Sequence, residues 1–314
     1  MRAHLARRLL LAVPTLLVLS FLIFALISAA PGDPATEYAL RTVPGGNVTP
    51  AQVAHARHQL GLDRPFIGQY THWVAAAVHG DLGRSFYRQT SVAREIRDRL
   101  GATGELAGAA LLITIVLAIP LGVAGAAFHR KLGDHVLRVF SLLGASTPSF
   151  FLAYVLIIVF AVHLKLLPVA GRQSLNAVVL PAITLAVGPT ALVARLLRSS
   201  MLEALSENYI VTAYGKGLRR LRVLVRHGLG NAVIPVVTVF GSIIGTLLEG
   251  AIIVEVVFAW PGLGRLVFEA ISERDYPLVE GLVLFAGVVY VVVNLLVDLS
   301  YAALDPRISA ASSL

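Results

Sequence analysis

The sequence predicts an all-α integral membrane protein, with six transmembrane helices and an extracytoplasmic helical domain between the first and second of them. Hydrophobic residues make up 57% of the 314 residues, charged residues only 14%, and the mean hydropathy is +0.78. An ordinary soluble domain contains about 25% charged residues. In addition, apolar runs long enough to cross a bilayer recur along the chain. A single soluble core could not hide this much apolar surface.

The first apolar run occupies residues 9–30. A hydrocarbon core of about 30 Å needs about 20 such residues. Arg2, Arg7 and Arg8 precede the run, as in a signal peptide. However, the run exceeds the 7–15 residues or so of a signal-peptide core, and Pro31 follows its small-residue cleavage site. We therefore expect residues 1–30 to form a cytoplasmic end and a retained first span.

Residues 31–100 are too polar to cross a membrane, and we expect them to form the extracytoplasmic domain. Thr49-Pro50-Ala51-Gln52 is typical of a capping box with proline at the first helical position, and Gly61 would end that helix. Two more helices are expected, at about 65–79 before Gly80 and at 91–100 before Gly101.

The remaining part, 101–314, is expected to be a five-helix transmembrane core. Its apolar runs lie at roughly 103–128, 136–162, 178–197, 231–258 and 278–303. Prolines fall in or near these runs and usually mark kinks in membrane helices: Pro120, Pro148, Pro181, Pro189 and Pro235. We find no internal repeat, which counts against a secondary transporter built from duplicated halves.

Short loops predict that both termini are cytoplasmic, because cytoplasmic loops carry an excess of Lys and Arg. On this arrangement loops 129–135 and 198–230 lie inside and hold most of the basic residues of the short loops. The chain contains no cysteine, which excludes disulfides and cysteine-ligated metals. The histidines do not cluster, and no metal site is expected.

The cytoplasmic loop 198–230 includes NYIVTAYGKGLRRLRVLVRHGLG, residues 208–230, with five basic residues and no acid. Each Arg or Lys costs roughly 2.5–3.5 kcal/mol at the centre of a span, so this stretch does not cross the membrane. Its helical spacing indicates a short amphipathic helix at about 203–217, a break at Gly215 and Gly217, and a second helix. The two apolar faces would be Leu202, Leu205, Tyr209, Ile210 and Ala213, then Leu218, Leu221 and Val225.

Two interpretations of this loop stay open on composition. It could be a basic helix that lies on anionic lipid, or a helix that docks into a partner protein. Nothing resembles a nucleic-acid recognition module, and no nucleic-acid partner is expected.

The loop resembles the coupling loop in the first membrane subunit of the dipeptide/oligopeptide ABC importer family. Val211 and Gly230 depart from the general form of that motif, which has Glu and Pro there. Segments 7–17, 30–35, 59–65, 79–85, 258–281 and 294–308 are similar to the same family in the same order, so the resemblance covers essentially the whole chain. The coupling-loop likeness is carried by Tyr209, Ile210, Thr212, Ala213, Lys216, Gly217, Leu218, Arg226, His227, Asn231, Ala232, Pro235 and Val236.

The resemblance implies a type I ABC importer permease fold and a transport subunit of the bacterial inner membrane rather than an enzyme. Its partners would be a second, homologous permease in a heterodimer, two cytoplasmic ATPase subunits or domains, an extracytoplasmic substrate-binding protein or lipoprotein, a peptide substrate and membrane lipid. The chain has no G-x-x-x-x-G-K-[ST] motif. We therefore expect no cofactor or catalytic residue here, and ATP and Mg in the partner ATPases. The ATPase-coupling residues would be Glu203, Glu207, Tyr209, Ile210, Ala213 and Gly217.

Charged residues within membrane spans are costly and usually face a cavity or a partner. Glu249 and Glu255 are therefore candidates for the translocation pathway, although Glu255 lies near the end of its span and could be interfacial. Asp298 could form a structural pair with Arg195 or Arg198 on another helix.

Several functions remain possible at this level. The main hypothesis is a permease for di- or oligopeptides. The same kind of importer could carry nickel chelates, glutathione or haem. A self-sufficient secondary transporter or channel is disfavoured by the coupling loop, and no catalytic constellation supports a membrane enzyme.

Overall fold

The computed structural model describes the backbone of residues 2–30, 32–42 and 47–304; within these ranges the side chains of 2–9, 238, 240–242, 248–249 and 297–304 are not described. The described residues form helices and no strand, apart from one isolated bridge between Arg84 and Ser91. The chain divides into two compact units, one of residues 1–101 and 265–314 and the other of residues 102–264. The N-terminal part of the first unit ends next to the expected division at 100/101, and residues 265–314 group with it.

In the first unit, α1 (Arg2–Ser28) packs along α13 (Tyr276–Leu304), and α4 (Phe66–Val78) packs against α1. Gly287 on α13 faces Leu19 so closely that a side chain would collide there. Between α1 and α4, the rings of Phe21 and Tyr70 meet edge to face, with their centroids 5.2 Å apart. The Ser20 and Tyr70 hydroxyls lie 2.9 Å apart in the same contact. Aromatic edge contacts of this kind add to the energy of burial.

Two short helices, α2 (Pro34–Thr42) and α3 (Pro50–Gln59), pack together through Ala35, Ala39 and Ala56. The predicted capping box is confirmed: the Gln52 backbone N–H donates to the Thr49 hydroxyl, and the Gln52 side chain accepts from the Thr49 backbone. The predicted end at Gly61 is also confirmed by its φ of +68°. Helix α2 was not expected, because its nine residues offer only one aliphatic pair at helical spacing, Ala35 and Ala39.

Asp33 ties these two helices together. Its carboxylate accepts from the Thr36 hydroxyl at 2.7 Å and from the Arg57 guanidinium at 2.7 Å. Partial burial acts to raise the pKa of Asp33, but the hydrogen bonds from Thr36 and the charge of Arg57 outweigh it and hold the pKa below its usual value.

The prediction that a helix ends at Gly101 is wrong. Helix α5 runs without interruption from Val92 to Ala127 and so joins the expected third helix of the outer domain to the expected second span. Gly101 keeps a helical φ, and glycine within a helix costs only about 1 kcal/mol relative to alanine. The apolar run that follows supplies enough packing to continue the helix.

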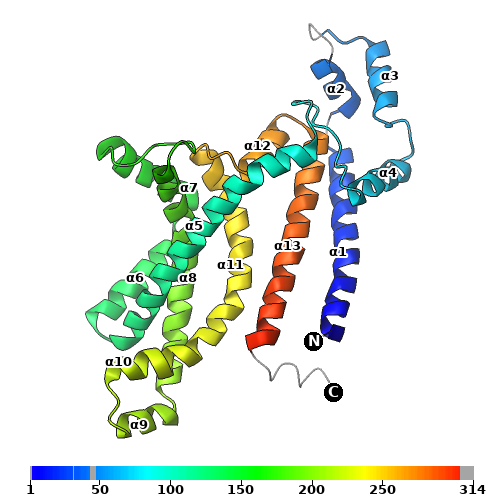
Figure 1. Ribbon diagram of the computed structural model, residues 1–314. Helices are drawn as coiled ribbons and strands as arrows, with labels where there is room; N and C mark the ends of the chain where they lie inside the picture. The colour runs from blue at the N-terminus through cyan, green and yellow to red at the C-terminus, as the bar shows by residue number, and fades with distance from the viewer. Residues whose placement is uncertain (1, 31, 43–46, 305–314) are drawn as a thin grey trace. The chain divides into compact units, whose positions relative to one another are not determined.

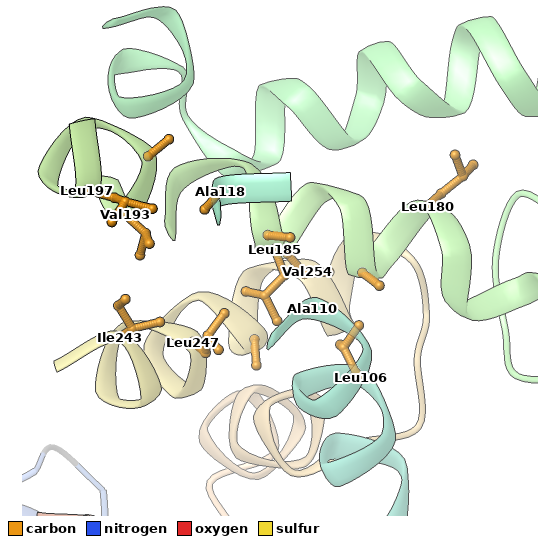
Figure 2. Packing of buried hydrophobic residues seen from close by; sticks show 14 of the residues in the cluster. Leu106, Ala110, Ala118, Leu180, Leu185, Val193, Leu197, Ile243, Leu247 and Val254 are labelled. Carbon is orange, nitrogen blue, oxygen red and sulfur yellow. The ribbon is translucent and has the colours of Figure 1, made fainter. Parts of the chain in front are cut away.

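Helix α8 (Val179–Leu205), preceded by the short η2 (Leu175–Val178), is the central helix of the second unit. In the most apolar stretch of this span 67% of the residues are buried, against 28% in the corresponding stretch of α5. Close packing is possible because small residues line its neighbours: a Cβ added to Gly122 of α5 would lie 2.8 Å from the Leu197 Cβ. Figure 2 shows side chains of this core, with Leu185, Val193 and Leu197 on α8.

The span expected at 136–162 is broken near Pro148, one of the prolines expected to mark a kink. Two helical segments replace it, α6 (Leu132–Ser146) and α7 (Ser149–Leu156) with its extension η1 (Ile157–His163), and they meet at 107°. The residue before a proline is disfavoured in the helical region. Accordingly Thr147, which precedes Pro148, is extended, and its N–H closes α6 on the Leu143 carbonyl at 2.9 Å.

After α8 the chain forms α9 (Asn208–Gly215), then a helical stretch made of α10 (Arg220–Arg222), the π-helical η3 (Val223–Leu229) and α11 (Gly230–Val257). Figure 1 shows these elements in order. A break at Ser206 and Glu207 separates α9 from α8. The single amphipathic helix predicted at 203–217 is therefore two pieces. Helix α12 (Leu263–Ser272) precedes α13.

Four described helical segments are long and apolar enough to cross a membrane, or five if the bent α6–α7 pair is one span. The fifth expected span, at 231–258, corresponds to α11, which includes side chains outside the described residues. Prolines lie inside the helices as predicted, at Pro120, Pro189 and Pro235.

Candidate functional site

The predicted coupling segment folds as a small packed unit at the end of α8. Ile210 and Ala213 on α9 are 3% and 5% exposed and pack against Val223 of η3. Leu205 and Leu218 cover the edges of this cluster. Both α9 residues therefore face their own chain. Their predicted role in binding an ATPase stays a prediction, and direct contact would require this packing to open.

Gly217 ends α9 in a Schellman motif. The Leu218 N–H donates to the Ala213 carbonyl at 3.3 Å and the Gly217 N–H donates to the Tyr214 carbonyl at 2.9 Å. The motif needs a residue in the left-handed region, and Gly217 has a φ of +74°. Leu218 then packs on the Ile210 cluster, as the motif usually requires. The glycine thus fixes the turn between α9 and α10.

The outward face of α9 is partly apolar. Val211 is 70% exposed and Tyr214 is 45% exposed. Leu221 and Val225, which were predicted to lie on the second apolar face, are also exposed. The buried positions are instead Val223 and Leu224, because the wider turns of the π-helical segment shift the register of the inward face.

Two polar contacts hold this small unit to neighbouring helices. The Asn231 amide donates to the Tyr209 hydroxyl and to the His227 carbonyl, each at 3.0 Å. Arg220 donates to the Ala127 carbonyl at the end of α5, at 2.6 Å. A cation at a helix C-terminus is favourable, since the last carbonyls carry partial negative charge. Of the loop arginines, Arg220 therefore has a structural contact as well as any role in topology.

A buried acid, Asp134, joins α6 to α8 close to the end of α5. It is 0% exposed and accepts hydrogen bonds from the Arg198 and Arg138 guanidinium groups, both at 2.8 Å, and from the Arg130 N–H at 3.1 Å. Removing one member of a buried ion pair typically costs about 3–5 kcal/mol. The partner suggested for Arg198 by the sequence was Asp298, and Asp134 was missed. Its spacing of four residues from Arg138 on a helix was the available signal.

Glu255 holds the corner that follows α11. Its carboxylate accepts from the Thr103 hydroxyl at 2.7 Å, and the same hydroxyl accepts from the Leu263 N–H at 2.7 Å. Gly262 and Gly264 leave room for the carboxylate, because a Cβ at either position would collide with it or with Ile252. Glu255 is 0% exposed. The structure therefore gives it a structural contact, and a pathway role stays a prediction that this packing does not support.

Trp260 closes the same corner. Its indole N–H donates to the Ala102 carbonyl at 2.8 Å, and its backbone N–H donates to the Glu255 carbonyl at 2.8 Å. The ring is fully buried. Both N–H groups of Trp260 are thus bonded within the second unit.

In the first unit, the loop at 84–91 is bound to the segment between α12 and α13. Asp275 is fully buried and accepts from the Ser85 hydroxyl, from the Phe86 N–H at 3.0 Å and from the Tyr87 N–H at 3.2 Å. These three donors, one O–H and two N–H groups, attach the loop to the segment that carries Asp275. Both segments overlap stretches of the sequence that resemble the family, but the sequence did not predict that they contact each other.

Glu269 on α12 strengthens this attachment. Arg88 donates to its carboxylate at 2.8 Å and Arg265 donates at 2.7 Å, while Arg99 lies 3.5 Å away. Burial acts to raise the pKa of Glu269, but the hydrogen bonds from Arg88 and Arg265 and the charge of Arg99 outweigh it, and the pKa is lowered.

Other predicted site residues are less informative. Glu203 is exposed and belongs to the last turn of α8, not to α9, and Glu207 is exposed at the N-cap of α9 without a side-chain cap bond. The side chains of Glu249 and Asp298 lie outside the described residues, so neither the pathway prediction nor the pair with Arg195 is tested. Among the described residues no group of three or more His, Cys, Asp or Glu side chains could hold a metal ion.

Comparison with known proteins decides the family. Residues 118–310 match the model of the binding-protein-dependent transport system inner membrane component, and residues 1–107 match the N-terminal model of the same kind of protein. This chain belongs to that family. It has the type I importer permease fold, and it is a multi-pass inner-membrane transport component rather than an enzyme.

Similar permeases cover nearly the whole chain. A putative peptide permease protein of Brucella ovis is 42% identical over 312 residues, covering 96% of this chain and 97% of the relative. The dipeptide transport system permease protein DppB of Escherichia coli K12 is 40% identical over 333 residues, with the same coverage. The glutathione transport system permease protein GsiC of Escherichia coli O6:H1 is 38% identical over 305 residues, covering 97% of this chain and 98% of the relative.

Replacing Gly217 with valine is expected to impair transport while the permease still assembles in the membrane. Nothing lies within 4 Å of a Cβ at Gly217, so the cost comes only from the backbone, about 1–2 kcal/mol for a non-glycine residue in the left-handed region. Uptake in cells and the amount of membrane-inserted protein would be compared. Gly217→Asn is the control, because asparagine tolerates this conformation. Equal uptake by G217V and the parent would contradict a role for this turn.

Glu269→Gln is expected to lower the thermal stability of the detergent-purified chain at pH 7. Because the folded-state pKa is lowered, the stabilisation is full above the unfolded value of about 4.3 and is lost as the pH falls through the folded pKa. The difference in unfolding temperature between parent and variant should therefore shrink below about pH 4. The exposed Glu207→Gln is the control. A difference that stays constant with pH would exclude the ion-pair explanation.

Proposed function

We propose that this chain is the membrane permease subunit of an ATP-driven importer and forms half of the pathway for di- or oligopeptides delivered by an extracytoplasmic binding protein. The observation that carries the proposal is similarity over almost the full length to a dipeptide permease and a peptide permease, at 40% and 42% identity. Glutathione is a second candidate cargo, because the relative that is 38% identical is named for glutathione transport.

The proposal includes partners that this chain does not contain. A second, similar permease would complete the pathway as a heterodimer, and two cytoplasmic ATPase subunits or domains would bind ATP and Mg. The chain would lie in a bacterial inner membrane with both termini in the cytoplasm, since the loops 129–135 and 198–230 are rich in basic residues.

The packing of α9 supports a mechanical role for this segment. Ile210 and Ala213 attach α9 to η3, and η3 continues directly into α11. A push on α9 therefore reaches a long helix without passing through a flexible linker. The exposed apolar side chains Val211 and Tyr214 provide the surface on which an ATPase would press, in place of the predicted but buried Ile210 and Ala213.

The cargo is tested by uptake in cells that lack this gene. Loss of labelled alanyl-alanine uptake, restored by the gene on a plasmid, is the expected result, with glutathione uptake unchanged. If only glutathione uptake is lost, the cargo is glutathione and not a peptide of this kind. If both labelled compounds enter normally, the proposed function is wrong.

The docking surface is tested by Val211→Asp. Burying an unpaired carboxylate in an apolar contact is costly, and 1.4 kcal/mol already corresponds to a tenfold change in affinity. We expect roughly tenfold or greater loss of co-purifying ATPase, together with loss of uptake.

Val78→Asp is the matched control, because Val78 is 79% exposed and belongs to the predicted extracytoplasmic region. This control should retain the ATPase. Full ATPase recovery with V211D would rule out the exposed face of α9 as the docking surface.

A further inference from the structure

A cavity of about 690 Å³ lies within the first unit. Its lining comes from the C-terminal part of α1, from α2, from α4 and the loop before it, from the loop that precedes α5, and from the first turns of α13. A volume in this range is typical of small-molecule sites.

Aromatic rings form two walls of this cavity. On one wall Phe24 and Trp73 lie 5.9 Å apart between ring centroids. On the other, Phe86 contacts Tyr38 at 5.2 Å and Tyr276 at 6.5 Å. Aromatic faces attract cations electrostatically, most strongly where the cation has lost its water shell.

Two residues that line the same space carry polar groups of opposite hydrogen-bonding type without a partner among the described residues. Glu280 on α13 is only 9% exposed, and its carboxylate makes no hydrogen bond or ion pair with the described residues. The Trp73 indole N–H is shielded and likewise has no hydrogen-bond acceptor there. Buried polar groups are normally satisfied, and an unpaired buried carboxylate is especially costly. A ligand that both donates to Glu280 and accepts from Trp73 would satisfy both.

Cationic side chains at the cavity do not neutralise Glu280. The Arg84 guanidinium is already bound to the Gln89 carbonyl at 2.7 Å. Arg64 also lines the cavity and remains exposed, as does Asp81 of opposite sign. These groups favour a ligand that carries an acceptor or anionic oxygen in addition to a cation.

We propose that this cavity binds a primary ammonium group with an acceptor oxygen nearby. The ammonium donates to Glu280 between the aromatic walls, and the oxygen accepts from Trp73. The amino terminus of a short peptide has this chemistry, and so does the head group of an ethanolamine phospholipid. With a peptide as occupant, the site rests on the proposed function and deepens it; binding to the purified chain and uptake in cells are separate measurements, so the failure of one is distinguishable from the failure of the other.

The test is calorimetric titration of the purified full-length chain in maltoside detergent, which has no amine, with alanyl-alanine and with N-acetyl-alanyl-alanine. We expect saturable binding of the free dipeptide and binding of the acetylated form weaker by about tenfold or more, as for hydrogen bonds to charged groups. This comparison needs no variant. Glu280→Gln should weaken free-dipeptide binding to a similar degree, while Asp98→Asn, an exposed carboxylate outside the cavity, should leave it unchanged.

The lipid source is tested separately in nanodiscs of phosphatidylethanolamine or phosphatidylglycerol, with the retained lipid counted by native mass spectrometry. Glu280-dependent retention of phosphatidylethanolamine, without dipeptide binding, would support the ammonium site and identify the phospholipid as its occupant. The proposal is overturned if the acetylated dipeptide binds as tightly as the free one. It is also overturned if E280Q changes neither dipeptide affinity nor lipid retention, or if neither ligand binds.

Discussion

A backbone amide in hydrocarbon cannot bond to water, so each departure from helix must be satisfied by the protein itself. This constraint explains where the chain turns. At Thr147 the N–H stays on the Leu143 carbonyl while Pro148, which has no N–H, begins the next segment. At the end of α11 the turn is instead built around a carboxylate, with Thr103 bridging Glu255 and the Leu263 N–H. At these two corners of the second unit, the Thr147 and Leu263 N–H groups thus bond to the protein itself.

Much of the fold could be predicted, because long apolar periodicity and turn chemistry are local signals. The first and last spans, the capping box at Thr49 and the glycine ends at Gly61 and Gly80 all follow from residues close together in sequence. One error is at Gly101, which does not end its helix, because glycine is only a weak helix breaker inside a run that is otherwise helical. Pro148 breaks its run, as a local proline signal predicts, although hydropathy alone treats that run as continuous.

The candidate site was predicted less completely, because many of its contacts join residues far apart in sequence. Spacing identified the glycine break at Gly217 and the inward residues Ile210 and Ala213, but not the inward residues of the following helix, where the π-helical segment buries Val223 and Leu224. The charged contacts were missed altogether. Asp134 meets Arg198 across 64 residues and Asp275 meets Ser85 across 190, and no pattern in a single sequence pairs residues so far apart.

The corner at Glu255 also constrains how this protein can change over generations. A side chain at Gly262 would occupy the space of the carboxylate, so that position can be altered only after position 255 has been shortened. Shortening Glu255 in turn removes the acceptor of the Thr103 hydroxyl. Single substitutions at these positions are therefore epistatic, and neutral drift at any one of them has to wait for a compensating change at another.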